Sequence, residues 1–324
     1  MSGTIYPFFN IVSLVTIIIC GCNSTRVIDS SVLKLRRDFC EPAPAERFIF
    51  PNISPQVAPR SLQEDSILAG FLSAQDSIIA NATGTVPLIL SLLTHARDSS
   101  LNGKLLFQIS SNKIHEKIQS IRIAMDALLA ELDCEATRTR EISSYLAKLS
   151  KRTNSMVIAA SITAGAVTTI APVFITGKSA QNGIAVGTGS LSVALAVISL
   201  HPFAKKVKLF HYRNLLSDIW YQPRYSTIYR PEIWYLLTND QLSNIKCVSR
   251  AQIVKTRWLK FYLDNNLDQP TEKLLFQNGG IYDTGNLDLR ASMLNELQFS
   301  IRSINQNFQH FITTIESVQA NGWK

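Results

Sequence analysis

The amino-acid sequence predicts a mainly α-helical fold: a long-helix bundle or coiled coil with an apolar helical hairpin inserted between its halves. Two stretches, one mid-chain and one C-terminal, repeat apolar residues at alternating spacings of four and three, which is the period of long packed helices. Between them, two uncharged runs of 25 and 26 residues flank Lys178. Each run is long enough to cross a bilayer, and together they predict the hairpin.

The mid-chain stripe predicts a helix from Lys104 to Arg152. No Pro or Gly occurs between Lys104 and Ala164, and only Glu135 and Thr139 interrupt the apolar pattern. The stripe consists of Ile114, Ile118, Ile121, Met125, Leu128, Leu132, Glu135, Thr139, Ile142, Leu146 and Leu149.

The C-terminal stripe predicts a second long helix, whose start is marked by the polar residues 284–286 and by Asp288. Its members are Leu287, Arg290, Leu294, Leu297, Ile301, Ile304, Phe308, Phe311, Ile315 and Val318. We expect the two stripes to pack on each other, with a helix from Leu62 to Ile79 as a third member. The alternative is a rod or a coiled coil that binds a partner.

The two uncharged runs predict a membrane hairpin with Lys178 at its polar tip. Both are rich in small residues, which allow helices to approach closely in lipid. The small residues that we expect to form this packing are Ala160, Ala164, Gly165, Gly183, Gly187 and Ala194. The alternative is a soluble hairpin buried in the protein core, because small residues make the runs less hydrophobic than a Leu-rich span.

The N-terminus contains an export or anchoring signal. Residues 1–25 carry no charge, and the apolar run 11–19 leads into Ile19-Cys20-Gly21-Cys22. This motif resembles the bacterial lipoprotein signal, over about a dozen residues, and the resemblance implies that Cys22 becomes the lipidated N-terminus. It departs from the pattern at Cys20 and in lacking Lys or Arg before the apolar run.

The same resemblance implies a location. With Asn23 after the cysteine, a Gram-negative lipoprotein would be held in the outer membrane, facing the periplasm. The alternative is the inner membrane with an uncleaved N-terminal anchor. By the positive-inside rule, the cations flanking the hairpin would place both flanks in the cytoplasm, but that rule has no direct hold on an outer membrane. These cations are Lys148, Lys151, Arg152, Lys205, Lys206 and Lys208.

A basic, aromatic segment follows the hairpin. Residues 205–262 contain eleven Lys/Arg and three Asp/Glu, a net charge of +8 that equals that of the whole chain. Aromatic rings beside cations are typical of an anionic lipid interface, so we expect interfacial contact there. The expected contact residues are Lys205, Lys206, Lys208, Trp220, Tyr221 and Trp234. The alternative is an ordinary core with a solvated face; nucleic acid is not expected, because no recognition motif is present.

The residue patterns do not predict an enzyme, a cofactor or a metal site. The segment 172–179 differs from a phosphate-binding loop in having Pro172 where the first glycine belongs, and the five histidines lack metal-ligand spacing. Cys40, Cys134 and Cys247 remain after processing, and the sequence does not say which two would pair in an oxidising compartment.

These features divide the chain into six segments: a signal peptide (1–21), an irregular tether (22–60), a helical part with the first long helix (61–152), the hairpin (153–204), the basic aromatic segment (205–285) and the C-terminal helix (286–324). We expect a non-enzymatic, membrane-associated envelope lipoprotein that acts in anchoring or assembly. Its expected partners are the lipid bilayer, further copies of itself or a helical protein. The alternative is an α-helical pore-forming protein, because the order of helices and apolar hairpin is similar to that of the cytolysin A group.

Processing at Cys22 is the first testable expectation. Cys22→Ala should leave an uncleaved precursor that incorporates no lipid, because the thiol is the acylated group. Labelling cells with radioactive palmitate measures this. Equal incorporation in the wild type and the variant would contradict the lipoprotein assignment.

Overall fold

The computed structural model describes residues 27–29, 40, 66–174, 205–243, 245 and 247–321, and for residues 29, 66, 67, 156–174, 319 and 321 it describes the backbone alone. Helices account for 73% of the residues that can be interpreted, which confirms the mainly α-helical class. A bundle or a coiled coil is a finer statement than these helices establish. Predicted features at Cys22, Lys178, Gly183, Gly187 and Ala194 lie outside the described residues.

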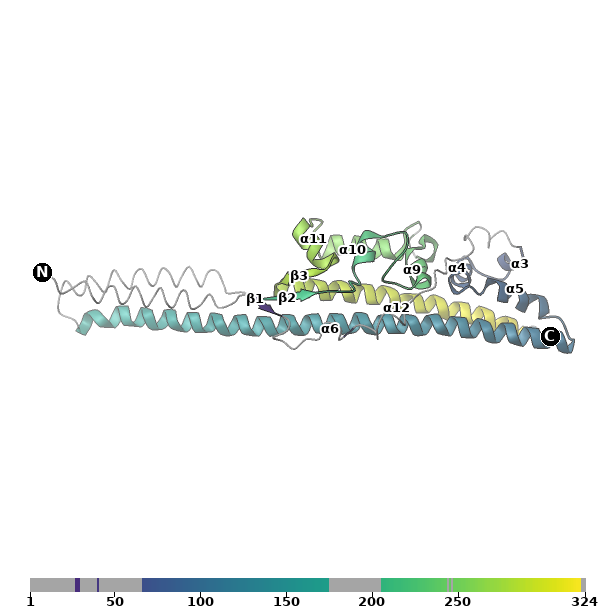
Figure 1. The fold of residues 1–324 in the computed structure, drawn as a ribbon, viewed down its shortest axis with the longest axis horizontal. Coiled ribbons are helices and arrows are strands. Elements are labelled where there is room, and N and C mark those ends of the chain that lie inside the picture. The colour runs from purple at the N-terminus through teal and green to yellow at the C-terminus, as the bar shows by residue number, and fades with distance from the viewer. Residues whose placement is uncertain are drawn as a thin grey trace. The chain divides into compact units, whose positions relative to one another are not determined.

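Two long helices dominate the described chain (Figure 1). The elements in order are β1 (Val27–Asp29), α3 (Ser66–Ala69), α4 (Ala74–Thr83), α5 (Val86–His95), α6 (Leu101–Phe174), β2 (Lys206–Phe210), α8 (Ser217–Tyr221), α9 (Pro231–Thr238), η2 (Asp240–Leu242), α10 (Arg250–Phe261), α11 (Gln269–Phe276), β3 (Gly279–Tyr282) and α12 (Thr284–Asn321).

These elements belong to two compact units. Unit 1 comprises residues 1–35, 140–209 and 280–288, and unit 2 comprises residues 36–139, 210–279 and 289–324. Both α6 and α12 therefore contribute one part to each unit.

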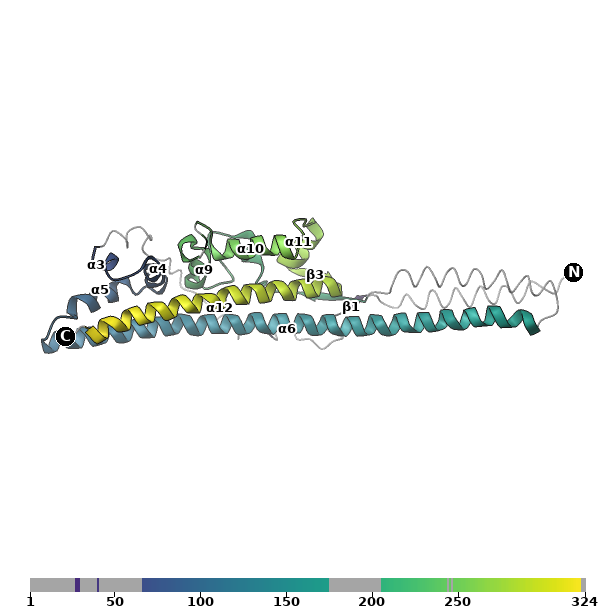
Figure 2. The same cartoon turned by 180° about the vertical axis from the view of Figure 1, so that it is seen from behind.

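Both predicted stripes are buried. All ten residues of the C-terminal stripe are at most 9% exposed, and in α6 only Glu135 and Leu149 among the eleven are more exposed than that. Burying an Ile, Leu or Phe side chain stabilises a fold by about 1.5–3 kcal/mol, so these two faces form the core. In unit 2 the helices run side by side in opposite directions (Figures 1 and 2), and the Gln298 side-chain amide donates to the Leu129 carbonyl at 3.3 Å.

The prediction of one continuous helix from Leu62 to Ile79 is wrong, because α3 ends at Ala69 and α4 begins at Ala74. Ser73 caps α4: its hydroxyl accepts from the Asp76 amide at 3.1 Å, and the Asp76 carboxylate accepts from the Ser73 amide at 3.3 Å. This reciprocal cap starts a new helix and thereby ends the preceding one. Gly84, with a φ of 59°, ends α4 in the left-handed conformation that glycine adopts most readily.

The shorter helices of unit 2 are fastened to the two long ones by polar contacts. His310 of α12 contacts Asp76 of α4 at 2.9 Å, and Ser91 of α5 contacts Ser110 of α6 at 2.9 Å. Helices α8 to α11 enclose an aromatic cluster in which the rings of Trp220 and Phe276 stack at 4.3 Å.

Unit 1 contains a three-stranded sheet that the sequence did not predict, with strand order β1-β2-β3. β1 pairs with β2 in parallel, with Val27 opposite Lys206 and Asp29 opposite Lys208. Residues alternate along β2 between exposed and buried, as expected of a strand with one covered face.

The start of α6 generates a prediction about Gly103. The Ser100 hydroxyl accepts from the Gly103 amide at 3.0 Å, and Asp98 folds over this turn, accepting from the Ser100 amide at 2.9 Å. A Cβ on Gly103 would lie 2.2 Å from Asp98 Cγ and 2.5 Å from its Cβ. Gly103→Ala should therefore lower the free energy of unfolding by about 1–3 kcal/mol, although alanine is the better helix former. Denaturant unfolding measures this, and the added change Asp98→Gly should remove the loss.

Candidate membrane-contact site

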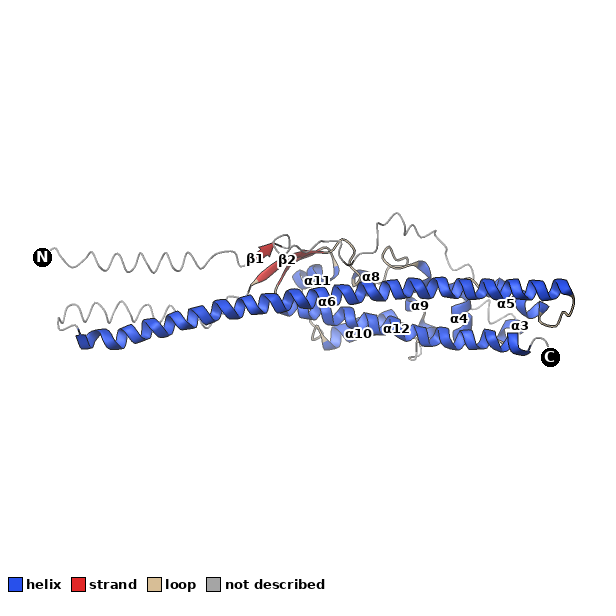
Figure 3. Cartoon of the chain, turned by 90° about the horizontal axis from the view of Figure 1, so that it is seen from below, coloured by secondary structure: helices blue, strands red, loops and turns tan. Residues whose placement is uncertain are grey.

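A parallel strand pair in unit 1 brings two distant chain segments to the same place. Because β1 and β2 are parallel and Val27 pairs with Lys206, the first residues of the two strands lie at the same end of the pair (Figure 3). The residues before Val27 lead back to Cys22 and its apolar run, and those before Lys206 lead back to the second uncharged run.

A hydrogen bond joins this place to α6. The Lys205 amide donates to the Ser150 hydroxyl at 3.0 Å, across 55 positions of sequence. Ser150 lies just before the first uncharged run, and Lys205 comes directly after the second. We call the region around this bond and the first residues of β1 and β2 the junction. In the sequence, each of the three uncharged segments (1–25, 153–177 and 179–204) therefore ends or begins within a few residues of the junction.

Six cationic residues lie in the junction segments 148–152 and 205–208, which contain no acidic residue. We call them the cationic collar: Lys148, Lys151, Arg152, Lys205, Lys206 and Lys208. Lys205 is half-buried and the other five are exposed. Lys208 lies opposite Asp29 in the strand register. Three of these residues were predicted as interfacial, whereas grouping all six at one site needed the structure.

The aromatic residues predicted beside them are not interfacial as a group. Trp220 is 9% exposed and Trp234 is 4% exposed, so both indoles belong to the core of unit 2. Their ring nitrogens are already hydrogen-bonded, to the Glu272 carboxylate and to the Pro223 carbonyl, both at 3.2 Å. Tyr221 remains 46% exposed. The correction follows from packing: an indole beside lysines has the same composition in a core as at a membrane surface.

Several cations of the basic segment have partners within unit 2. Arg213 pairs with Glu131 at 2.7 Å, Arg230 pairs with Glu232 at 3.1 Å, and Arg257 pairs with Glu296. The Lys255 ammonium lies 4.8 Å from the centre of the Trp220 ring. The segment therefore does not present all of its cations on one free surface, although its composition favoured such a surface.

For the predicted hairpin residues, the backbone of α6 is continuous through Ala160, Ala164 and Gly165 to Phe174. Lys178 and the second run lie outside the described residues. Where side chains are described, no single helix is long and apolar enough to cross a bilayer; α4 and α5 satisfy the criterion only as a pair, bent by 112°.

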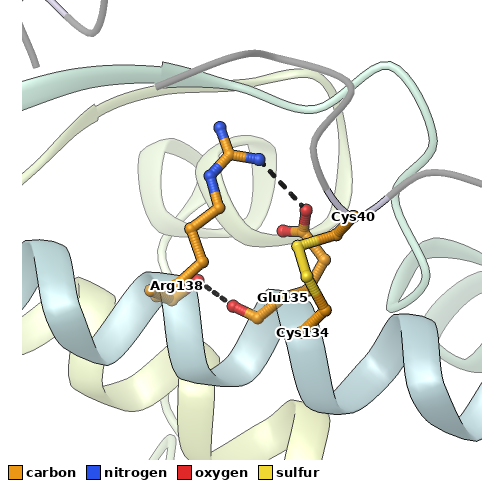
Figure 4. Close-up of a disulfide and its surroundings, with 5 residues drawn as sticks. Cys40, Cys134, Glu135 and Arg138 are labelled. Atoms are coloured by element: carbon orange, nitrogen blue, oxygen red, sulfur yellow. Dashed lines mark hydrogen bonds and ion pairs between the residues drawn. A yellow bond between two sulfur atoms is a disulfide. The ribbon is translucent and has the colours of Figure 1, made fainter. Parts of the chain in front are cut away.

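A disulfide joins the N-terminal part of the chain to α6. Cys40 and Cys134 are bonded, with a Cα–Cα distance of 5.5 Å, and Glu135 and Arg138 lie beside the bridge (Figure 4). Arg138 donates to Glu135 at 3.3 Å. The sequence left the pairing open, and Cys247 is the exposed, unbonded cysteine.

A polar network is buried in the core of unit 2. The Asn214 amide donates to the carbonyls of Leu275 and Gln277 at 2.8 and 2.7 Å, and its oxygen accepts from the Arg290 guanidinium at 3.1 Å. Arg290 also donates to Leu275 at 3.0 Å. Burial, together with the positive charges of Arg290 and Arg138, lowers the pKa of His211 well below its usual value.

An apolar groove of about 620 Å³ runs between α6 and the start of α9. Ile123, Ala124, Ala127 and Leu128 form its α6 side, and Ile233 belongs to the opposite side. The groove offers apolar contact rather than a catalytic constellation. Among the described residues, no group of three or more His, Cys, Asp or Glu is placed to hold a metal ion.

No protein-family model, no curated protein and no solved structure matches this chain. A functional proposal for this chain therefore rests on the arrangement of its own residues.

The buried histidine predicts a pH dependence of stability. In the unfolded chain His211 takes up a proton near pH 6.5, whereas in the folded chain its pKa is lower. The unfolded state therefore binds more protons below pH 6.5, and the free energy of unfolding should fall by up to about 1.4 kcal/mol per pH unit there. His211→Gln should flatten the decline between pH 6.5 and 5 in denaturant unfolding, while His95→Gln should not; equal slopes in both variants would contradict the assignment.

Proposed function

We propose that this chain is a non-enzymatic envelope lipoprotein that acts in anchoring or assembly. In this proposal the chain is attached to a membrane at the junction, by a lipidated Cys22 and by the hairpin 153–204. The helices of unit 2 then form the part that is available to other proteins. The observation that carries the proposal is that Val27, Ser150 and Lys205, which in sequence lie next to the three uncharged segments, are close together in unit 1.

The chain lengths support a common attachment. Cys22 lies five positions before Val27, so it can be no farther than about 18 Å from the first residue of β1. The two uncharged runs begin and end within a few residues of Ser150 and Lys205, which are hydrogen-bonded to each other. A protein held in one bilayer by an acyl chain and a helical hairpin needs all these connections on one side. An ordinary core hairpin would also bring its own two ends together, but it would not require the N-terminal segment beside them.

The disulfide supports export. Structural disulfides form and persist in oxidising compartments and are rare in the cytoplasm. The Cys40–Cys134 bridge closes a separation of 94 residues. It therefore agrees with a periplasmic or extracellular body, and not with the cytoplasmic flanks that the positive-inside rule alone would give.

The experiment separates the hairpin from the acyl chain. In a Cys22→Ala variant that lacks residues 1–21, neither the acyl chain nor the N-terminal apolar run is present, so attachment depends on the hairpin. A buried charge at a span centre costs about 2.5–3.5 kcal/mol. Ala166→Asp or Ala194→Asp should therefore abolish flotation with liposomes, whereas Ser179→Asp, beside the polar tip, should not. Retained flotation in both Ala→Asp variants, with helicity unchanged by circular dichroism, would make the hairpin ordinary core and overturn this part of the proposal.

Dye release from the same vesicles distinguishes anchoring from pore formation. Flotation without release supports an anchor. Release that Gly187→Leu abolishes while flotation persists would instead support the pore-forming alternative, because a bulky side chain disturbs close helix packing more than insertion.

A further inference from the structure

We infer that the cationic collar recognises the phosphate headgroups of anionic phospholipids, so that membrane attachment depends on the charge of the lipid surface. This inference rests on the proposed function and adds to it the lipid class that the site selects. It also replaces the basic aromatic segment with the collar as the electrostatic contact.

The first support is that four of the six cations of the collar are not held in ion pairs by any described residue. Within the part of the chain that the structure describes, no ion pair involves Lys148, Lys151, Arg152 or Lys206. The arginines 213, 230 and 257 of unit 2 differ, because each of them has a glutamate partner. These four cations of the collar are thus not neutralised by an acidic partner among the described residues.

The second support is that the collar is held in place. Residues 148–152 belong to α6, and residues 206–208 belong to β2, whose register is fixed by β1. The bond between the Lys205 amide and Ser150 ties the two segments together. Cations fixed in this way lose little backbone entropy on binding, and neighbouring charges closer than the Debye length of about 8 Å act together.

The third support is the position of the collar along the chain. Its members lie directly before the first uncharged run and directly after the second. If the runs span a bilayer, residues at these positions lie at headgroup depth, where a lysine or arginine gains from anionic lipid. This position favours a lipid surface over nucleic acid or a soluble phosphate compound.

The test is a competition between two kinds of vesicle. The Cys22→Ala variant that lacks residues 1–21 is offered equal amounts of phosphatidylcholine vesicles and of vesicles with 30% phosphatidylglycerol, each with its own dye, and the protein is quantified on each after flotation. The wild-type collar should favour the anionic vesicles at least tenfold at low salt. Each lysine near the surface is worth about fivefold, the equivalent of about 1 kcal/mol.

The decisive variant is Lys148→Gln/Lys151→Gln/Lys206→Gln, which should lower the preference at least tenfold relative to the unaltered collar while flotation with neutral vesicles persists. The matched control is Lys113→Gln/Lys117→Gln/Arg122→Gln, which removes three exposed cations from α6 away from the junction. It should keep the preference, and 1 M salt should abolish the preference of every variant.

The outcomes separate this inference from the proposed function. The anionic-lipid inference would be overturned if the protein with the unaltered collar were distributed equally between the two kinds of vesicle. It would also be overturned if the decisive and control variants lost the preference equally. Either result would leave the hairpin attachment standing. Absence of flotation with either vesicle would overturn the attachment itself. Loss of the preference on adding inorganic phosphate at constant ionic strength would assign the site to free phosphate. Loss on adding single-stranded DNA would assign it to nucleic acid.

Discussion

The parallel pairing of β1 with β2 is the constraint on which the functional reading of this protein depends. An antiparallel pair would send the chain segments preceding the two strands to opposite ends of the sheet, whereas a parallel pair sends them to one end. The Lys205–Ser150 hydrogen bond then adds α6 to the same site. A three-residue strand buries little surface, so its importance lies in geometry. It places Val27 beside Lys206, and the Lys205–Ser150 bond places α6 beside both.

A different constraint organises unit 2. Arg290 occupies a position in the apolar stripe of α12, and this charged residue is only 1% exposed. Asn214 makes this tolerable, because its side chain makes hydrogen bonds with Arg290, Leu275, Gln277 and the Leu216 amide at once. Removing one partner of such a network leaves buried polar groups without hydrogen bonds, which costs more than the mean value of a hydrogen bond. The packing of residues 214–277 against α12 therefore depends on polar contacts as well as on buried apolar area.

The sequence predicted what depends on local periodicity. The two stripes were identified residue by residue because a helix repeats its faces every few positions, and even Arg290 and Thr139 at stripe positions proved to be buried. What it could not predict was long-range: the sheet, whose strands lie far apart in sequence, and the partner of Cys134. The core positions of Trp220 and Trp234 were missed for another reason. Composition records which residue types are present and not which side chains cover them, so a membrane interface and a core look alike.

The disulfide between Cys40 and Cys134 has a mechanical consequence. If the chain is held by its N-terminal part and loaded through α12, force reaching Cys40 passes through the bridge directly into α6. The stretch between the two cysteines contains α3, α4, α5 and the first half of α6, and it carries none of that tension. These helices are thereby protected from unravelling under load.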